Sequence, residues 1–161
     1  MAVAVLIIPA TASASGDQHG VALEAISGTG SGTVNVTNTP GVPGFSAEIT
    51  LNVHGTSPNT TFWVQRAPEL GRPLGTDGVC QRADGLDPWV GAPRFVQVPL
   101  PLTTPFETLT TSAGGAGVDH FFINLPAVAD TAVFDVEFRL VNSLTSPTVE
   151  LRSECFTIHV K

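Results

Sequence analysis

Apolar and polar residues alternate with a period of two along most of the chain, which is typical of β-strands that bury one face. In residues 46–54 the apolar positions are Ala47, Ile49, Leu51 and Val53. Residues 133–140 repeat the alternation, with Asp135 and Glu137 on the polar face. We expect these two carboxylates in solvent. Residues 155–160 form a third such strand, with Phe156, Ile158 and Val160 inward and Cys155 outward.

Weaker strand patterns fill the remaining chain, at residues 21–26, 33–37, 60–66, 94–98, 106–111 and 118–125. No window of helical length carries an apolar stripe, and 13 prolines and 16 glycines interrupt the chain at strand-length intervals. The pattern therefore predicts an all-β, antiparallel, two-sheet sandwich of about eight or nine strands. We expect a single domain over residues 15–161, of the immunoglobulin or fibronectin kind.

Residues 67–93 show no strand pattern and form one long connection, which contains four prolines and five glycines. It contains Cys80, and the only other cysteine is Cys155. An even cysteine count in an exported chain favours a disulfide. The bridge would close a loop of roughly 76 residues and contribute on the order of 4 kcal/mol in the chain-entropy model. It would pin the long loop to the outer face of the last strand; two unpaired buried thiols are the alternative.

The segment from Leu51 to Val64 reads LNVHGTSPNTTFWV and contains the pattern G-x-x-P-x-T-x-aromatic-x-V. It resembles a recurring corner of fibronectin type III-like and related bacterial β-sandwich domains. The resemblance covers about 14 residues and implies a strand, a tight turn at Pro58 and Asn59, and a strand with an inward aromatic. Phe62 stands where the family usually has tyrosine, so the corner hydroxyl is missing. Such domains mostly serve as extracellular interaction or spacer modules.

Residues 1–14 carry no charge, and residues 2–8 form an apolar run. Ala12-Ser13-Ala14 matches the small-x-small pattern that precedes a signal cleavage site. We interpret this segment as an export signal, with a truncated leader because no basic residue precedes the run. A mature β-strand, or a donor strand that completes the sheet of a neighbouring subunit, are the alternatives. The run is too short to span a bilayer.

The charge balance restricts the kinds of partner. The chain has 7 Lys and Arg against 14 Asp and Glu, a formal net charge of -7, and only 13% charged residues. Scattered arginines and a single lysine disfavour nucleic acid, and an anionic membrane surface would repel the chain. We expect an unknown protein or glycan partner.

No constellation of residues indicates catalysis, a metal or a cofactor. The histidines His19, His54, His120 and His159 are far apart and lack the i, i+2 spacing of strand metal sites. There is no G-x-S-x-G motif and no phosphate-binding glycine loop. We therefore expect no enzyme, no metal and no cofactor.

Trp63 and Trp89 are the aromatic residues best suited to ligand recognition, because aromatic side chains exposed on a sheet can stack on sugars or peptides. With Arg72 and Arg82 they form a candidate ligand platform on the outer face; packing of Trp89 onto Trp63 is the structural alternative. The leading hypothesis is a secreted, non-catalytic interaction or structural module. A carbohydrate or small-ligand domain and a self-assembling subunit are the alternatives.

Overall fold

The computed structural model describes residues 18–39, 41–71, 74–80, 95–98 and 105–160. These residues form ten β-strands and no helix. The strands are β1 (Gln18–Ser27), β2 (Ser31–Asn38), β3 (Phe45–His54), β4 (Thr61–Pro68), β5 (Val96–Gln97), β6 (Thr108–Thr110), β7 (Gly117–Leu125), β8 (Val133–Val141), β9 (Glu150–Ser153) and β10 (Phe156–His159). The all-β, antiparallel prediction is confirmed, and the expected leader (residues 1–14) lies outside the described residues. No helix in the described part of the chain is long and apolar enough to cross a membrane.

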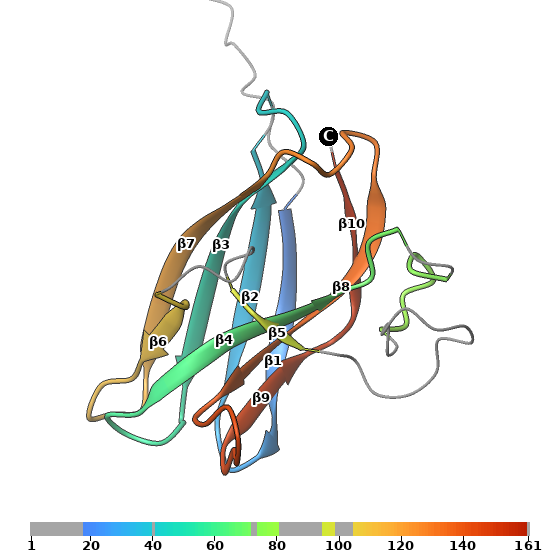
Figure 1. The fold of residues 1–161 in the computed structure, drawn as a ribbon. Helices are drawn as coiled ribbons and strands as arrows, with labels where there is room; N and C mark the ends of the chain where they lie inside the picture. The colour runs from blue at the N-terminus through green and yellow to red at the C-terminus, as the bar shows by residue number, and fades with distance from the viewer. Residues whose placement is uncertain (1–17, 40, 72–73, 81–94, 99–104, 161) are drawn as a thin grey trace, which may run out of the picture.

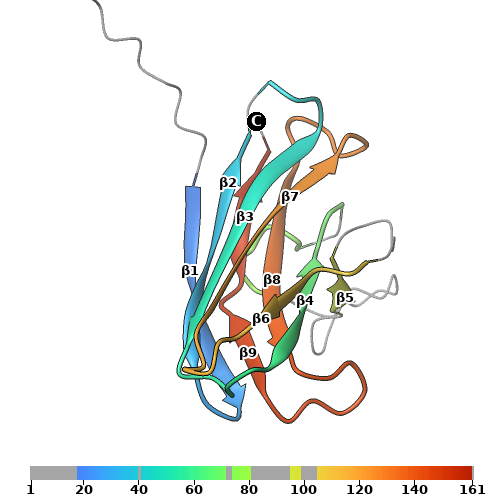
Figure 2. The same ribbon diagram turned by 90° about the vertical axis from the view of Figure 1, so that its left-hand side faces the viewer.

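All ten strands belong to one hydrogen-bonded sheet, whose main path runs β5-β4-β8-β9-β1-β2-β3-β7. β6 pairs with β4, and β10 pairs with β8 beside this path. The sheet curls so that β3 and β7 face β4 and β8 across the interior (Figures 1 and 2). The curled sheet is a half-barrel with two walls, one formed by β5, β4 and β8 and the other by β1, β2, β3 and β7, and β9 joins them. The expected division into two separate sheets is not confirmed.

The interior of the half-barrel contains the apolar faces that the alternation predicts. On β3, Ala47, Ile49, Leu51 and Val53 are buried while the residues between them are not. On β8, the buried apolar side chains are Phe134, Val136, Phe138 and Leu140. The rings of Phe45 and Phe134 meet edge to face across the interior, with centroids 5.5 Å apart. One apolar core therefore holds both walls.

The chain that follows β3 makes the corner that the sequence predicts. Pro58 and Asn59 form a turn, and Asn59 has a φ of 48°. Phe62 then enters the core and is fully buried. The Thr111 hydroxyl donates to the Ser57 carbonyl at 2.7 Å and accepts from the Thr60 N–H at 3.0 Å. These two hydrogen bonds attach the turn to Thr111, which directly follows β6.

A one-residue bulge separates β9 from β10 along the same edge of β8. Arg139 lies opposite Arg152, whereas Val136 lies opposite Phe156, so three steps on β8 match four on its partner. At the bulge the Phe138 N–H donates to the Ser153 hydroxyl at 2.9 Å instead of to a backbone carbonyl. A bulge of this kind re-aims the side chains that follow it.

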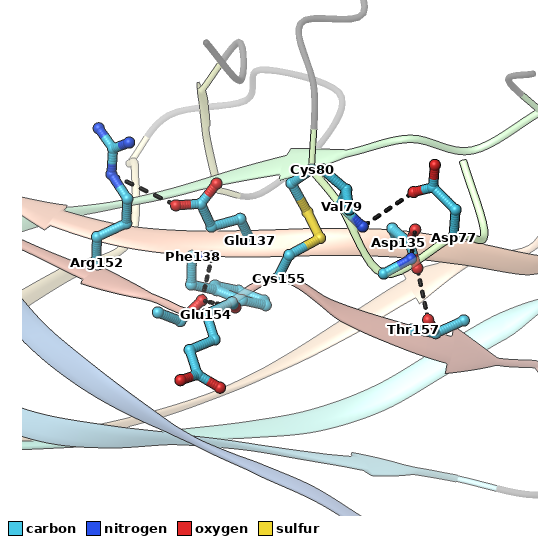
Figure 3. The surroundings of a disulfide bond; sticks show 12 residues. Asp77, Val79, Cys80, Asp135, Glu137, Phe138, Arg152, Glu154, Cys155 and Thr157 are labelled. Atoms are coloured by element: carbon cyan, nitrogen blue, oxygen red, sulfur yellow. Dashed lines mark hydrogen bonds and ion pairs between the residues drawn. A yellow bond between two sulfur atoms is a disulfide. The ribbon is translucent and has the colours of Figure 1, made fainter. Parts of the chain in front are cut away.

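The predicted disulfide forms between Cys80 and Cys155, with Cα atoms 5.4 Å apart. Cys155 lies in the bulge, and Cys80 ends a piece of chain that we call the docked segment (residues 69–71 and 74–80). Figure 3 shows the disulfide attaching this segment to the outer side of the sheet, near Asp135 and Thr157. The described part of the long loop is therefore pinned where the sequence predicts.

The expectation that Asp135 and Glu137 lie in solvent is wrong. Asp135 is 0% exposed and Glu137 is also buried. Both point away from the apolar core, as their alternation requires, but they lie under other parts of the chain. The hydrogen bonds of the docked segment to Asp135 show what covers it. Alternation identifies the face of a strand and not what covers that face.

The core assignment predicts a clear contrast between two substitutions. Leu51→Ala removes a fully buried side chain and should lower the free energy of unfolding by about 2–5 kcal/mol. Val118→Ala, at a side chain that is 68% exposed, should cost less than about 1 kcal/mol. Urea denaturation with the disulfide intact measures both. Equal costs at the two positions would contradict the assignment of the inner face.

Candidate functional site

The interior of the half-barrel is not completely filled. A cavity of about 90 Å³ lies between the walls, lined by residues of β2, β3, β4, β7, β8 and β10 and by Leu70 and Val128. By the same measure a single water molecule needs only about 10–15 Å³, and protein interiors contain few larger voids. The cavity is partly open to the surface, and Leu70, at 38% exposure, is the most exposed of its described lining residues.

The accessible surface of the cavity wall is entirely apolar, so Arg66 contributes carbon atoms of its side chain to the wall and not its guanidinium group. Val36, Ile49, Ile123 and Phe134 are among its lining residues, and of the described lining residues Arg66 alone carries a charge. Arg66 follows Phe62 and Val64 on the inward face of β4, where period two places every second side chain inside.

Arg66 is a buried cation without a counter-ion among the described residues. It is 5% exposed, and no described group accepts a hydrogen bond from its buried Nη2 atom. Burial lowers the pKa of Arg66 from its ordinary value to about 10, because the charged form loses its hydration. The side chain is still cationic at neutral pH. An unpaired buried charge is costly to a fold and is therefore a candidate functional group.

On the outer side of the sheet, Asp135 holds the docked segment through its backbone and its side chain. Its carbonyl accepts from the Glu69 N–H at 2.8 Å, and its N–H donates to the Gly75 carbonyl at 2.7 Å. Its carboxylate accepts from the Gly78 N–H at 2.7 Å and from the Thr157 hydroxyl at 2.6 Å. The buried carboxylate thus accepts two hydrogen bonds and has no ion pair with a described residue, so we assign Asp135 a structural role.

A charged cluster covers the outer face of β4, β8 and β9, and its members are Gln65, Phe95, Glu137, Arg139, Glu150 and Arg152. Arg139 Nε donates to Gln65 Oε1 at 2.7 Å. Arg152 Nη2 lies 2.7 Å from Glu150 Oε1, and its Nε lies 3.4 Å from Glu137 Oε1. The Phe95 ring centre lies 4.3 Å from the guanidinium carbon of Arg139 and 5.0 Å from that of Arg152.

The charges of this cluster are matched within it. Burial raises the pKa of Glu137 above its ordinary value, and the nearby positive charge of Arg152 opposes that rise. Two guanidinium groups and two carboxylates leave no net charge for a ligand to neutralise. The cluster therefore stabilises the outer face, in contrast to the unpaired Arg66 inside.

The predicted ligand platform is only partly described. Trp63 is half-buried on β4, opposite Thr108 of β6 and Val141 of β8. Trp89, Arg72 and Arg82 lie outside the described residues, so their position relative to Trp63 stays a prediction.

The histidines lie on separate parts of the sheet. His54 contacts the Ser31 hydroxyl at 3.4 Å and His120 contacts the Thr50 hydroxyl at 3.0 Å, both across neighbouring strands. His19 packs against Phe156, with ring centres 6.1 Å apart. No three metal-ligating side chains gather within the described ranges.

Sequence reasoning missed the cavity and Arg66. The available signal was the alternation itself, which continues from Phe62 and Val64 to Arg66 and places a charge on the inner face. The cavity has no such signal, because its existence depends on how side chains from six strands pack.

Asp135→Ala removes a carboxylate that accepts two hydrogen bonds and should lower the free energy of unfolding by about 3 kcal/mol or more. It should also speed amide exchange at Gly78, whose N–H loses its acceptor. The matched control is Asp77→Ala, because Asp77 is exposed and its carboxylate accepts from Val79 N–H alone among the described groups. Denaturation and hydrogen exchange measure both variants; unchanged exchange at Gly78 in Asp135→Ala would contradict the assigned role.

Two carboxyls predict a pH dependence of stability. Burial, followed by the negative charge of Asp119, raises the pKa of Glu107 above 4.5. Burial also raises the pKa of Asp119 above 3.8, opposed by a backbone hydrogen bond and the charge at His120. A carboxyl with a raised pKa binds its proton more tightly in the folded chain than in the unfolded chain. It therefore adds stability as the pH falls through the raised pKa, and loses that contribution as the pH rises.

Glu107→Gln should therefore be more stable than the wild type at pH 7, and its stability should change less between pH 7 and the ordinary carboxyl pKa. Glu48→Gln is the control, because Glu48 is exposed on β3. Thermal unfolding across this pH range measures the effect. Identical pH profiles for wild type and Glu107→Gln would show that burial does not penalise the charged form of this carboxyl.

Comparison with known proteins adds no relative to this picture. A scan against protein-family models, a search of curated proteins and a search of solved structures each found no match. The function is therefore inferred from the geometry of the cavity.

Proposed function

We propose that the protein is a secreted, non-catalytic β-domain that acts as an extracellular binding module and takes a small, largely apolar ligand into the half-barrel. The observation that carries the proposal is the apolar cavity of about 90 Å³ that is partly open to the surface. An apolar cavity of about 150 Å³ in another protein stays dry and binds benzene. In proportion, a cavity of about 90 Å³ suits a ligand with roughly three or four carbon atoms.

Two further observations support an extracellular setting. The disulfide between Cys80 and Cys155 is typical of oxidising compartments, and the apolar residues 2–8 with Ala12-Ser13-Ala14 favour export. Kinship with immunoglobulin-like or fibronectin-like sandwiches remains part of the proposal, supported by the corner at Pro58 and Asn59 and by the inward Phe62.

A protein-interaction role is the second candidate. Val118 and Phe122 lie on the outer face of β7 and are 68% and 51% exposed. The two side chains share this face with His120 between them, and exposed apolar side chains of this kind favour contact with a partner. A glycan partner would use Trp63, and a self-assembling subunit would use residues 1–14.

The ligand-binding proposal is tested with 1-butanol as the probe. A ligand at one hundred times its Kd stabilises a folded protein by about 2.7 kcal/mol, which raises the melting temperature of a domain of this size by roughly 5–10 °C. Val128→Phe, which places a ring at the cavity wall, should abolish the shift. Val118→Phe on the outer face should retain it. No shift in the wild type, or an equal shift in both variants, would contradict binding in the cavity.

A further inference from the structure

β7 is the last strand on the main path of the sheet and has one edge without a partner strand among the described residues. Its other edge pairs with β3 from Gly117 to Leu125. β6 lies against one end of the open edge, because a Cβ atom on Gly117 would lie 3.0 Å from the Thr110 carbonyl oxygen. Figure 1 shows β7 as the outermost strand of its wall. The edge from Asp119 to Leu125 is therefore open in the described part of the chain.

This open edge has few of the features that keep exposed strands from pairing. Edge strands in native proteins are usually short, carry lysine or proline, point a charge inward, or are twisted by a bulge. β7 contains no lysine, arginine or proline, and its register with β3 has no shift. Its one carboxylate, Asp119, points inward close to the end that β6 covers. The remainder of the edge, towards Leu125, has none of these features.

The side chains of β7 anchor the strand on one face and leave an aromatic ring open on the other. Phe121 and Ile123 are buried and belong to the apolar core. Phe122, between them in sequence, points outward and is half exposed. A strand that is anchored in this way loses little conformational entropy when it pairs with another chain. The edge is therefore a rigid template with a large apolar side chain near its middle.

We propose that β7 pairs antiparallel with β7 of a second copy of this chain, about a two-fold axis at Phe122. In such a pair, residues directly opposite each other point to the same face. Phe122 then lies opposite Phe122 of the second copy and its exposed ring gains an aromatic partner. Because the axis is two-fold, both open edges are covered at once and the assembly closes at two copies.

The sequence of β7 matches itself in this register. On the outer face His120 lies opposite Asn124 of the second copy, so a polar side chain meets a polar one. On the inner face Phe121 lies opposite Ile123 of the second copy, so an apolar side chain meets an apolar one. This self-complementarity favours a second copy over an unrelated strand. The inference rests on the protein-interaction candidate, to which it gives a partner, and does not depend on ligand binding in the cavity.

The first test is sedimentation equilibrium of the full chain from about 10 μM to 1 mM, a range in which weak pairs are populated. The wild type should change from monomer to dimer as its concentration rises. Phe122→Lys should weaken the dimer by about tenfold or more, because it places two positive charges directly opposite each other at the axis. Ile26→Lys is the matched control, since Ile26 is an exposed apolar residue on β1, and it should leave the dimer unchanged.

The second test uses cross-linking to measure the register. Opposite residues in an antiparallel pair have Cα atoms about 4.5–5.5 Å apart, which a disulfide can span. The double variant His120→Cys/Asn124→Cys should therefore form a covalent dimer under mild oxidation. Either single variant should not, because its thiol lies about four residues, or roughly 13 Å, from the same position in the second copy. The native cysteines are already joined to each other.

Each result decides for or against the inference. A wild type that stays monomeric over the whole range would overturn it, and the 1-butanol titration would still decide ligand binding separately. A dimer that Phe122→Lys leaves intact would place the contact elsewhere and overturn it. A covalent dimer of His120→Cys alone would place His120 at the axis and overturn the pairing about Phe122. The wild-type measurement needs no variant, so it decides even if a substitution prevents folding.

Discussion

The double pairing of β9 is the constraint on which the half-barrel depends. This four-residue strand pairs with β8 on one edge and with β1 on the other, so it joins the two walls into one sheet. The walls then face each other across a shared apolar core, and the side chains must fill whatever space the curl leaves. The cavity lies in that space, so its shape follows from a short strand that contributes none of its described lining residues.

The buried charged groups on the two sides of the sheet differ in whether they have a partner. Outside, Asp135 receives hydrogen bonds from Gly78 and Thr157, and Arg152 is paired with Glu150. Every such group gains a partner from the fold itself, so its burial is consistent with a structural role. Inside, Arg66 lacks such a partner among the described residues. His19, Asn38 and Asp119 also have a buried side-chain atom without a hydrogen-bond partner among the described residues, so Arg66 is not the one exception in the fold.

Much of the fold could be predicted from local pattern, and the rest depends on contacts between distant residues. Period two correctly identified the inner faces of β3 and β8, and the pairing partner of Cys80 followed from the cysteine count. β9 was missed because Glu150–Ser153 has a single apolar inward residue, Leu151, and its existence depends on two remote strands. The solvated positions expected for Asp135 and Glu137 were wrong because residues distant in the sequence lie against them, the docked segment at Asp135 and Arg152 at Glu137. The inward position of Arg66 was missed although the alternation from Phe62 and Val64 extends to it, and no local signal indicates the cavity beside it.

The docked segment links the outer face to the cavity. Glu69 donates its N–H to Asp135 on the outside, and the next residue, Leu70, lines the cavity. The same segment ends at Cys80, whose covalent bond to Cys155 holds it on the sheet. The docked segment beside the cavity is therefore preorganised. A flexible segment would lose conformational entropy when a ligand binds, whereas this segment loses part of that entropy earlier, when the protein folds and the disulfide forms.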